Sequence, residues 1–389
     1  MLIGYEASAL QGCKSGVGYY AENLLAGMMS VAPQHDYVLF SNRDMAGAWD
    51  APAAERLSIY KGRYFPVRMA WMQGVLPGTL RRVRPDVCHY PNYLAPVASK
   101  CPSVVTLHDM TLFVTPRFHN WKKLLLDRTL IPLVARRAQA IVTVSHSAGD
   151  DIVRYLGVPP SKVHVIMNAV SSAFHEISDK AQLNVVRARY GLDGPYILYV
   201  GTIEPRKNLV RLINAFRILK KHGLPHKLVL VGQQGWHSAS IYAEVEKHDL
   251  RKDVLFTGYV PFGDLPALYS GASVMAFPSL YEGFGLPVLE AMSCGAPVVT
   301  SRSSALAEVA DGAALLVDPQ SSGQIADALY SVCTDSDLAT ELSAKGRARA
   351  RQFTWENAAR ATLEVYDGLV ANSVVAPQPR GIRTARIQD

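Results

Sequence analysis

The chain has 389 residues, of which 49% are apolar and 19% are charged, a composition typical of a soluble globular protein with room for two domains. Its net charge of +7 suits an anionic small ligand, an anionic membrane surface or nucleic acid, and does not choose among them. No run of about 18 apolar residues occurs, and the five cysteines are scattered without CxxC spacing, so we expect a cytoplasmic protein with reduced thiols and no membrane span.

Short apolar, β-rich segments alternate with helical patterns along the whole chain. The first half offers LIGYEA, YVLF, DVCHY, SVVTL, AIVTVS and VHVI, and the second half offers YILYVG, KLVLVG, VLFTG, SVMAFP, APVVTS and ALLVD. Strands that are apolar throughout and separated by helices are typical of parallel sheets covered on both faces. About six strand candidates in each half therefore predict two doubly wound α/β domains.

The predicted domains are residues 1–172 and residues 190–353, with a polar boundary between them. A further helix is predicted over about 354–371, because Thr354 can cap it and Glu356 lies in its first turn. Residues 372–389 lack periodicity and contain prolines, so we expect them to form a mobile tail.

Ligands bind beyond the carboxyl ends of the strands in open α/β sheets, so the loops there are the places to search. The first such loop, SALQGCKSGVGYYAENLL, contains Gly16, Gly18 and Ala21 in a G-x-G-x-x-A pattern. A nicotinamide dinucleotide would need an acid at the end of the second strand, where Ser41 and Asn42 stand instead. A glycine loop that a ligand can approach closely, or simply a flexible loop, fits better.

Two further loops place charged side chains after strands. In VVTLHDM, His108 could meet a sugar hydroxyl or a developing charge, or be structural, and Asp109 could cap the next helix. In YVGTIEPRKNL, Arg206 and Lys207 stand between a strand and a helix. Two adjacent cations beside free helix N–H groups favour an anion site, such as one for phosphate, over solvated surface charges.

A fourth loop, in SVMAFPSLYEGFGLPVLEAMSCG, carries two acids. We expect Glu282 in the loop, Pro287 and Glu290 in the first turn of the following helix, and Gly295 at its end. A carboxylate can accept two hydroxyl hydrogen bonds, which is how a ribose or hexose diol is held. The alternative is a capping acid and a surface glutamate. Backbone N–H groups that could face a phosphate or a sugar ring belong to Phe284, Gly285 and Leu286.

These segments together resemble one family. YEGFGLPVLEAMSCGAPVVTS resembles the E-x7-E region of retaining GT-B glycosyltransferases of family 4, also called glycosyl transferases group 1. YVGTIEPRKNL resembles their phosphate-binding segment, GVGYYAENL their N-terminal glycine loop, and LHD their histidine motif. The chain is also similar to bacterial mannosyltransferases of O-antigen and exopolysaccharide assembly. The resemblance implies two Rossmann-like domains facing a central cleft, with the C-terminal helix returning to the N-terminal domain.

The resemblance implies a role for each acid and cation of the second domain. Arg206 and Lys207 would grip the donor diphosphate and stabilise the charge that grows on it. Glu290 would hold the ribose hydroxyls of the nucleotide. Glu282 would hold hydroxyls of the transferred sugar, and the nearby backbone N–H groups that would share this task belong to Phe284, Gly285 and Leu286.

The remaining implied contacts surround this donor site. Gly16 and Gly18 would let the N-terminal loop close on the diphosphate, and His108 would touch the sugar and support the transition state. The nucleotide base would sit near FTGYV, at backbone groups around Tyr259 and Val260. The catalytic residues implied are thus His108, Glu282, Arg206 and Lys207.

One segment departs from the family pattern. Members often have Asn-Gly-Val-Asp after the last strand of the first domain, whereas this chain has MNAVSS, with Ala169 for the glycine and Ser171 for the acid. The backbone geometry near Asn168 is therefore harder to predict from the resemblance.

Retention without a placed nucleophile indicates front-face attack, in which the acceptor hydroxyl approaches on the side that the diphosphate leaves. Glu282 as a covalent nucleophile is the minority alternative. The Asp-x-Asp triplet at Asp335 and Asp337 lies in a predicted loop between helices, away from the strand ends. We expect no metal and no cofactor besides the nucleotide-sugar co-substrate, because Arg206 and Lys207 can neutralise the diphosphate.

We therefore expect a hexosyltransferase that moves mannose from GDP-mannose onto a lipid-linked oligosaccharide or polysaccharide, without nucleic acid as a partner. Alternatives are a UDP- or dTDP-sugar donor for glucosyl, N-acetylglucosaminyl or rhamnosyl transfer, a UDP-sugar 2-epimerase, a non-catalytic sugar-nucleotide-binding subunit, and an oxidoreductase. Residues 63–85 and 118–138 mix aromatics, leucines and Arg/Lys. They predict either loose contact with the inner face of an anionic cytoplasmic membrane or ordinary amphipathic helices packed on the sheet.

Overall fold

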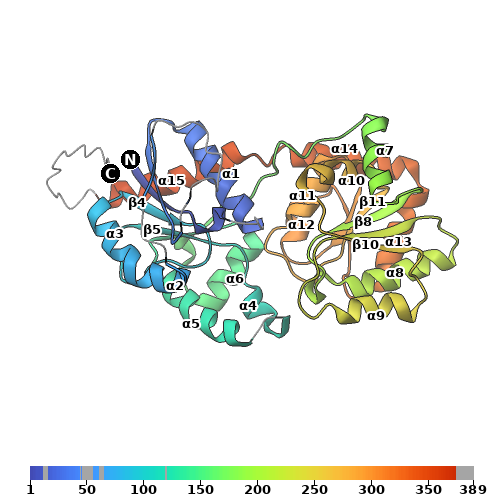
Figure 1. The fold of residues 1–389 in the computed structure, drawn as a ribbon, viewed down its shortest axis with the longest axis horizontal. Coiled ribbons are helices and arrows are strands. Elements are labelled where there is room, and N and C mark those ends of the chain that lie inside the picture. The colour runs from blue at the N-terminus through green and yellow to red at the C-terminus, as the bar shows by residue number, and fades with distance from the viewer. Residues whose placement is uncertain (12–15, 44, 46–55, 61–64, 119–120, 374–389) are drawn as a thin grey trace.

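The computed structural model describes residues 1–11, 16–43, 45, 56–60, 65–118 and 121–373 of the chain. Two parallel sheets lie in two lobes, which we call the N-terminal and C-terminal lobes (Figure 1). The prediction of two doubly wound α/β units is thus confirmed. Of the predicted mobile tail, residues 374–389 lie outside the described residues.

The N-terminal sheet has seven strands in the order β3-β2-β1-β4-β5-β6-β7. They are β1 (Leu2–Glu6), β2 (Asp36–Phe40), β3 (Leu57–Ile59), β4 (Val87–Tyr90), β5 (Ser103–Leu107), β6 (Ala140–Thr143) and β7 (Val163–Val165). Strand β3 was not predicted, because it is a three-residue edge strand, largely exposed, and carries little of the apolar signal of a buried strand.

Helices and short turns of helix connect these strands and cover both faces of the sheet (Figure 1). They are η1 (Ser8–Leu10), α1 (Gly16–Val31), α2 (Arg68–Ala70), η2 (Trp71–Val75), α3 (Leu76–Val83), α4 (Thr111–Val114), η3 (Pro116–Phe118), α5 (Trp121–Arg137), α6 (His146–Leu156) and η4 (Pro160–Lys162).

The C-terminal sheet has six strands in the order β10-β9-β8-β11-β12-β13. They are β8 (Tyr196–Val200), β9 (Lys227–Val231), β10 (Val254–Gly258), β11 (Val274–Phe277), β12 (Val298–Ser301) and β13 (Leu315–Val317). The helices around them are α7 (Lys180–Arg189), η5 (Pro205–Lys207), α8 (Leu209–Lys221), α9 (Ala239–Lys247), η6 (Phe262–Asp264), α10 (Leu265–Ser270), α11 (Leu286–Ser293), α12 (Ala305–Ala310), α13 (Ser322–Thr334) and α14 (Ser336–Ala350). Helix α7 packs on α10 of the C-terminal lobe. The predicted domain limits at residues 172 and 190 stay predictions.

The last helix, α15 (Trp355–Ser373), leaves the C-terminal lobe and packs on α1 in the N-terminal lobe, as the fold prediction required (Figure 1). The predicted cap is confirmed, since the Thr354 side chain accepts from the Asn357 N–H at 3.2 Å. The two helices approach closely because α1 has a glycine at their contact. A Cβ on Gly27 would lie 2.9 Å from the Trp355 carbonyl oxygen, too near for a larger residue.

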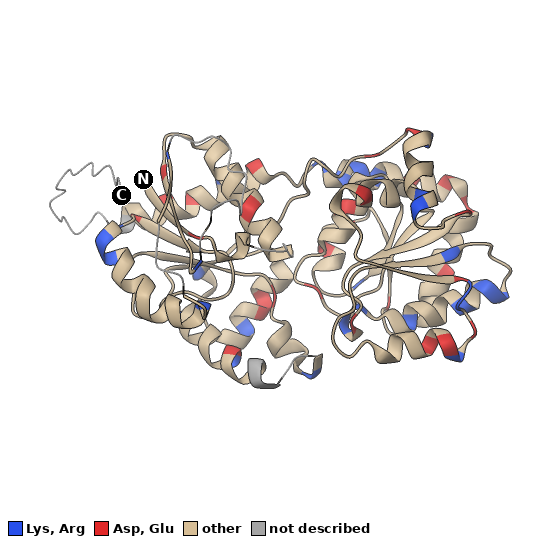
Figure 2. Cartoon of the chain, viewed as in Figure 1, with Lys and Arg blue, Asp and Glu red and all other residues tan. Residues whose placement is uncertain are grey.

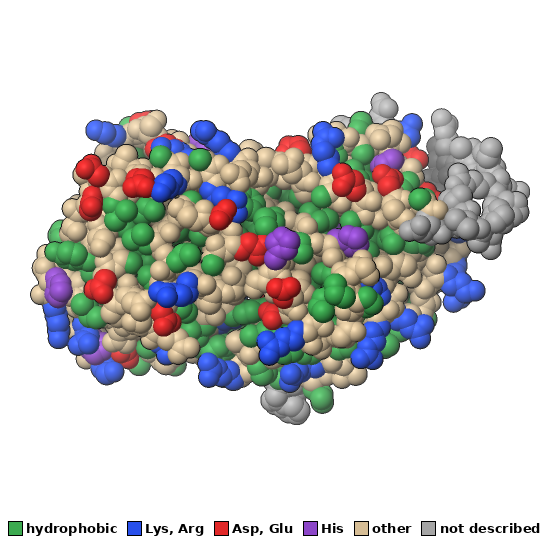
Figure 3. Space-filling view, turned by 180° about the vertical axis from the view of Figure 1, so that it is seen from behind, with side chains coloured by type: hydrophobic (Ala, Val, Ile, Leu, Met, Phe, Trp, Pro, Cys, Tyr) green, Lys and Arg blue, Asp and Glu red, His purple; other side chains and the backbone are tan. Residues whose placement is uncertain are grey.

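Charge is largely absent from the strands, as burial in a parallel sheet requires (Figure 2). The described strands carry charged side chains only at Glu6, Asp36 and Lys227. On the face shown in Figure 3, Lys and Arg side chains are spread among other types and do not gather in one stripe. None of the helices in the described part of the chain combines the length and apolar character needed to cross a bilayer.

Candidate active site

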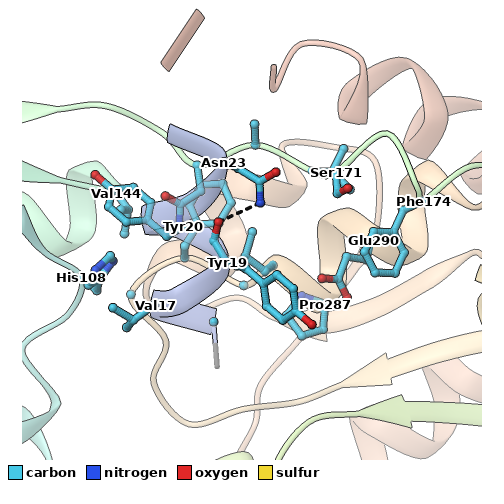
Figure 4. A pocket seen from close by; sticks show the side chains of 18 of the residues that line it. Val17, Tyr19, Tyr20, Asn23, His108, Val144, Ser171, Phe174, Pro287 and Glu290 are labelled. Carbon is cyan, nitrogen blue, oxygen red and sulfur yellow. Dashed lines mark hydrogen bonds between the residues drawn. The ribbon is translucent and has the colours of Figure 1, made fainter. Parts of the chain in front are cut away.

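A cavity of about 350 Å³ lies between the two lobes and is walled by both. The N-terminal lobe supplies the start of α1, the loop after β5 and the segment after β7, and the C-terminal lobe supplies the loop before α11 and its first turns. In Figure 4, Tyr19, Tyr20 and Asn23 of α1 lie on one side, and Glu290 and Phe174 lie across from them. The carboxyl ends of β5 and β11 thus meet at one opening, as expected of open α/β sheets.

The predicted cations are joined to Glu282 by ion pairs. Arg206 Nη1 lies 3.0 Å from one Glu282 oxygen and Lys207 Nζ lies 2.7 Å from the other. Burial alone would raise the pKa of Glu282, but Arg206 and Lys207 more than offset it and lower the pKa to about 2. Glu282 is therefore ionised at neutral pH and is already bound on both oxygens by cations.

A second buried acid, Glu204, completes this cluster. Its carboxylate lies 2.7 Å from Arg206 Nη2, and the residue is only 2% exposed. Burial opposes the charge of Arg206, but Glu282 and Glu204 outweigh burial and raise its pKa. Sequence reasoning missed Glu204, although an acid two residues before a cation pair at a strand end was a signal that could have indicated it.

The loop between β11 and α11 has the predicted form, with one correction. Gly285 has φ of +111°, α11 begins at Leu286 and Pro287 lies in its first turn, while Gly295 ends the helix with φ of +78°. A Cβ on Gly285 would meet the Leu306 side chain at 2.5 Å, so this turn needs glycine. Phe284, Gly285 and Leu286 all line the cavity.

The correction concerns Glu290, which lies beyond the first turn of α11. The helix starts one residue before Pro287, so Glu290 is its fifth residue. It still lines the cavity, and its Oε2 accepts a hydrogen bond from the Tyr269 hydroxyl at 2.8 Å. Burial raises the pKa of Glu290 to about 7, and the tyrosine lowers it in part.

His108 lines the cavity from the N-terminal lobe. Its Nε2 lies 2.8 Å from the Pro91 carbonyl oxygen, which can only accept, so Nε2 carries the proton. Burial lowers the pKa of His108, and the neutral ring keeps an unprotonated Nδ1. Asp109 stands one residue before Met110, the N-cap of α4, so the expected cap position is off by one, but its carboxylate accepts from both the N–H and the hydroxyl of Thr111 in the first turn.

The predicted glycine loop is wrong in its local structure. Gly16 and Gly18 both belong to α1, and the loop residues 12–15 before them lie outside the described residues. Gly16 lines the cavity, whereas Gly18 is buried in the helix and lies outside the lining set. The helix instead presents Tyr19, Tyr20 and Asn23 to the cavity, which the glycine pattern did not predict.

The predicted base contacts lie outside the cavity lining. Tyr259 is 66% exposed and Val260 is buried, and neither faces the cavity. The nearby Phe262 does line it and stacks on Tyr19 of the other lobe, with ring centroids 5.2 Å apart. Phe174 packs edge-on against Phe262 at 5.0 Å, so an aromatic cluster stands beside Glu290.

The segment that departs from the family pattern also reaches the cavity. Asn168, Ala169 and Ser171 line it, and the buried Asn168 Oδ1 has no hydrogen-bond partner among the described residues. Trp355 at the start of α15 lines it too, with its Nε1 equally without a partner there. The charged residues in the described lining are Asp109, Glu282 and Glu290, so no Lys or Arg side chain faces this space.

The Asp-x-Asp triplet has a structural role. Asp335 caps α14 by accepting from the N–H groups of Asp337 and Leu338, each at 3.0 Å. Within the described residues no group of three or more His, Cys, Asp or Glu side chains could hold a metal ion. The metal-independent mechanism stays a prediction.

Known proteins share both lobes. Residues 14–174 match the family described as Glycosyltransferase Family 4, and residues 186–349 match the one described as Glycosyl transferases group 1. The chain is 33% identical over 302 residues to the O-antigen chain mannosyltransferase B of Escherichia coli, with 77% of each chain covered. It is 29% identical over 320 residues to a glycogen synthase of Mycobacterium tuberculosis, covering 78% of this chain and 73% of that protein.

Solved structures share the fold over nearly the whole chain. The sucrose-phosphate synthase of Thermosynechococcus elongatus superposes with a TM-score of 0.75 at 21% identity, covering 95% of this chain and 99% of the other. A likeness at this identity speaks for the arrangement of the two lobes alone.

Proposed function

The chain belongs to glycosyltransferase family 4 (glycosyl transferases group 1) and has the GT-B fold, and on that premise we propose that it transfers mannose from GDP-mannose with retention of configuration. The proposed acceptor is a lipid-linked oligosaccharide or polysaccharide of cell-surface glycan synthesis. The observation that carries the proposal is the placement of Glu282 at the wall of the cavity between Arg206 and Lys207. The mannosyltransferase relative at 33% identity supports the choice of sugar.

The cation pair supplies the electrostatic part of the reaction. When the bond from the sugar to the diphosphate breaks, negative charge collects on the departing phosphate oxygens. Arg206 and Lys207 are largely buried beside the cavity and are positioned by Glu204 and Glu282, and their proposed task is to stabilise that charge once the donor binds. In the first turn of α11, the N–H groups of Val288 and Leu289 bond to the Gly285 carbonyl oxygen, so the Leu286 N–H is the one proposed to face the same charge. Removing one preorganised donor to a developing oxyanion in other enzymes costs roughly 100- to 1,000-fold in kcat.

Front-face attack fits the state of Glu282. The acceptor oxygen forms its bond to the anomeric carbon on the side where the bond to the phosphate oxygen breaks, and the acceptor proton passes to that phosphate oxygen. Glu282 has a lowered pKa and two cations on its oxygens, which makes it a weak nucleophile. Its proposed task is to accept hydroxyl hydrogen bonds from the sugar, and Glu290 would do the same for the ribose.

The lining of the cavity supports an uncharged acceptor. Within the described lining the charged side chains are acidic, and they are accompanied by the rings of Tyr19, Phe174 and Trp355. Such a surface favours a neutral sugar, which offers hydroxyl donors to carboxylates and C–H faces to aromatic rings.

Contact with a membrane is the remaining part of the proposal. Helix α5 buries Ile131 and Val134, as an ordinary amphipathic helix would, yet Leu125 is 67% exposed and Leu126 is 51% exposed. Exposed leucines beside a basic residue such as Arg128 suit the surface of an anionic bilayer. At that surface the protein would meet a lipid-linked acceptor embedded in the bilayer.

A panel of GDP-, UDP- and dTDP-sugars tests the donor by the rise in unfolding temperature that a bound ligand causes. GDP-mannose should protect the protein most, and a second assay should then detect GDP release that depends on an added mannosylated lipid acceptor. If only a UDP- or dTDP-sugar protects the protein, that sugar nucleotide is the donor in place of GDP-mannose, and the protein is still a glycosyltransferase. Release of nucleotide without transfer of sugar to the acceptor would contradict the proposed transferase activity. NMR of the product gives its anomeric configuration, which decides whether the reaction retains configuration.

A further inference from the structure

Tyr281, the residue before Glu282, inserts into the opposite lobe. It is 6% exposed, and its hydroxyl donates to Asp151 Oδ2 of α6 at 2.7 Å. The Tyr281 hydroxyl oxygen also accepts a hydrogen bond from the Met110 N–H, at 3.3 Å. Tyr281, in the loop between β11 and α11, thus bonds to α6 and to the loop after β5 in the N-terminal lobe.

Gly283, the residue after Glu282, is also fastened to that lobe. Its carbonyl oxygen accepts from Ser145 Oγ at 2.7 Å, and Ser145 is the fully buried N-cap of α6. A Cβ on Gly283 would lie 1.9 Å from the His108 carbonyl oxygen, so the loop backbone rests directly on the loop that carries His108.

We propose that Tyr281 and Ser145 are positioning residues for transfer, which hold Glu282 by its two chain neighbours so that it reaches its working position only when the lobes are closed. This inference rests on the proposed function, since it assigns how the sugar-binding acid of that reaction is placed. It requires no contact of either residue with the substrate, and neither lines the cavity.

The cation site is tied to the same contact. Arg206 Nη1 donates to the Tyr281 carbonyl oxygen at 2.8 Å, besides its ion pair with Glu282. A shift of Tyr281 therefore displaces the sugar-side acid and the phosphate-side cation together. Closure of the lobes and assembly of the donor site are then one event rather than two.

A third contact between the lobes provides a matched control. The Glu308 carboxylate of α12 accepts from the N–H groups of His146 and Ser147, at the same end of α6. Glu308 lies on a different element from Glu282, so its loss loosens the lobes without releasing the loop.

The kinetic test is a pair of double-mutant cycles. Tyr281→Phe should lower kcat about tenfold, the effect of losing one hydrogen bond to a charged group. In a Glu282→Gln background it should cost less than about twofold more, because the group that it positions is gone. Glu308→Ala, which removes the acceptor, should cost the same factor in both backgrounds.

An equal cost of Tyr281→Phe in both backgrounds would overturn the proposal. So would a Glu308→Ala cost that also vanishes with Glu282→Gln, because closure alone would then explain both variants. Asp151→Asn, which can still accept from the tyrosine, should restore most of the activity that Asp151→Ala loses.

Hydrogen exchange of the unliganded protein tests the same contact without any activity. Tyr281→Phe should raise exchange of the amides in residues 279–285 by about tenfold, the same hydrogen-bond effect, and Glu308→Ala should leave them unchanged. Unchanged exchange in Tyr281→Phe would overturn the positioning role even if transfer is established. If the protein transfers no sugar but Tyr281→Phe still raises the exchange, the proposed function is refuted while the role of Tyr281 in positioning the loop is supported.

Discussion

The Tyr269 hydroxyl lies 2.8 Å from Glu290 Oε2, so a buried tyrosine donates a hydrogen bond to the acid that lines the cavity. Burial raises the pKa of Glu290 to about 7 despite this bond. The carboxyl group that we propose for ribose binding therefore changes its charge in the neutral range, and an arriving pair of hydroxyl donors would favour its ionised form.

Glu290→Gln should stabilise the protein more at pH 8 than at pH 5. The pKa of Glu290 in the folded protein, about 7, exceeds the ordinary glutamate value of 4.5, so ionisation costs folding free energy as pH rises through that interval, and the full cost is present above pH 7. The gain at pH 8 should exceed that at pH 5 by about 2 kcal/mol in urea unfolding. Glu341→Gln on the exposed face of α14 is the control, and equal gains at both pH values for Glu290→Gln would contradict the raised pKa.

Glu282→Gln should lower kcat by roughly 10- to 100-fold and preserve the anomeric configuration of the product. The amide keeps one acceptor for a sugar hydroxyl, but it loses the charge that pairs with Arg206 and Lys207. Initial rates and product NMR measure the two quantities. Complete loss of turnover would favour a covalent nucleophile, and Glu364→Gln on α15 serves as the exposed control.

Gly283→Ala should abolish transfer while the protein stays folded. The added carbon would lie 1.9 Å from the His108 carbonyl oxygen, so the two loops must separate and the lobes cannot close on the donor. Gly78→Ala on α3, where a Cβ meets nothing within 4 Å, should be nearly silent. Steady-state rates with thermal unfolding compare the pair, and an active Gly283→Ala would show that the lobes work without this contact.

Leu125→Ser combined with Leu126→Ser should weaken binding to vesicles with anionic lipids. Both leucines are exposed on α5, and burying each in a bilayer contributes roughly 1.5 to 3 kcal/mol. Cosedimentation with vesicles measures the loss. Val185→Ser, at a 61% exposed valine on α7 of the other lobe, should bind like the wild type, and equal behaviour of both proteins would remove α5 from the proposal.

Local patterns in the sequence were sufficient for the elements that carry the donor site. Pro287 and Gly295 correctly predicted the start and end of α11, because proline and glycine restrict the backbone at their own positions. Thr354 likewise predicted the cap of α15. Strand candidates in each half predicted the two doubly wound domains, and the family resemblance added the cleft between them and the return of the C-terminal helix.

Contacts between distant segments could not be predicted in the same way. Tyr281 and Asp151 are 130 residues apart, and nothing in either neighbourhood indicates the other. The glycine pattern predicted a loop, but Gly16 starts a helix, since glycine permits a turn without requiring one. Tyr259 was placed at the base by resemblance, yet it is exposed and lies outside the cavity lining.

The return of α15 has a consequence for how the chain folds during synthesis. Tyr366 of α15 is fully buried in the N-terminal lobe and contacts His89 of β4 through its hydroxyl. His89 lies 277 residues earlier, so this lobe leaves the ribosome with part of its interior uncovered. The N-terminal lobe therefore stays incomplete during synthesis until α15 has left the ribosome.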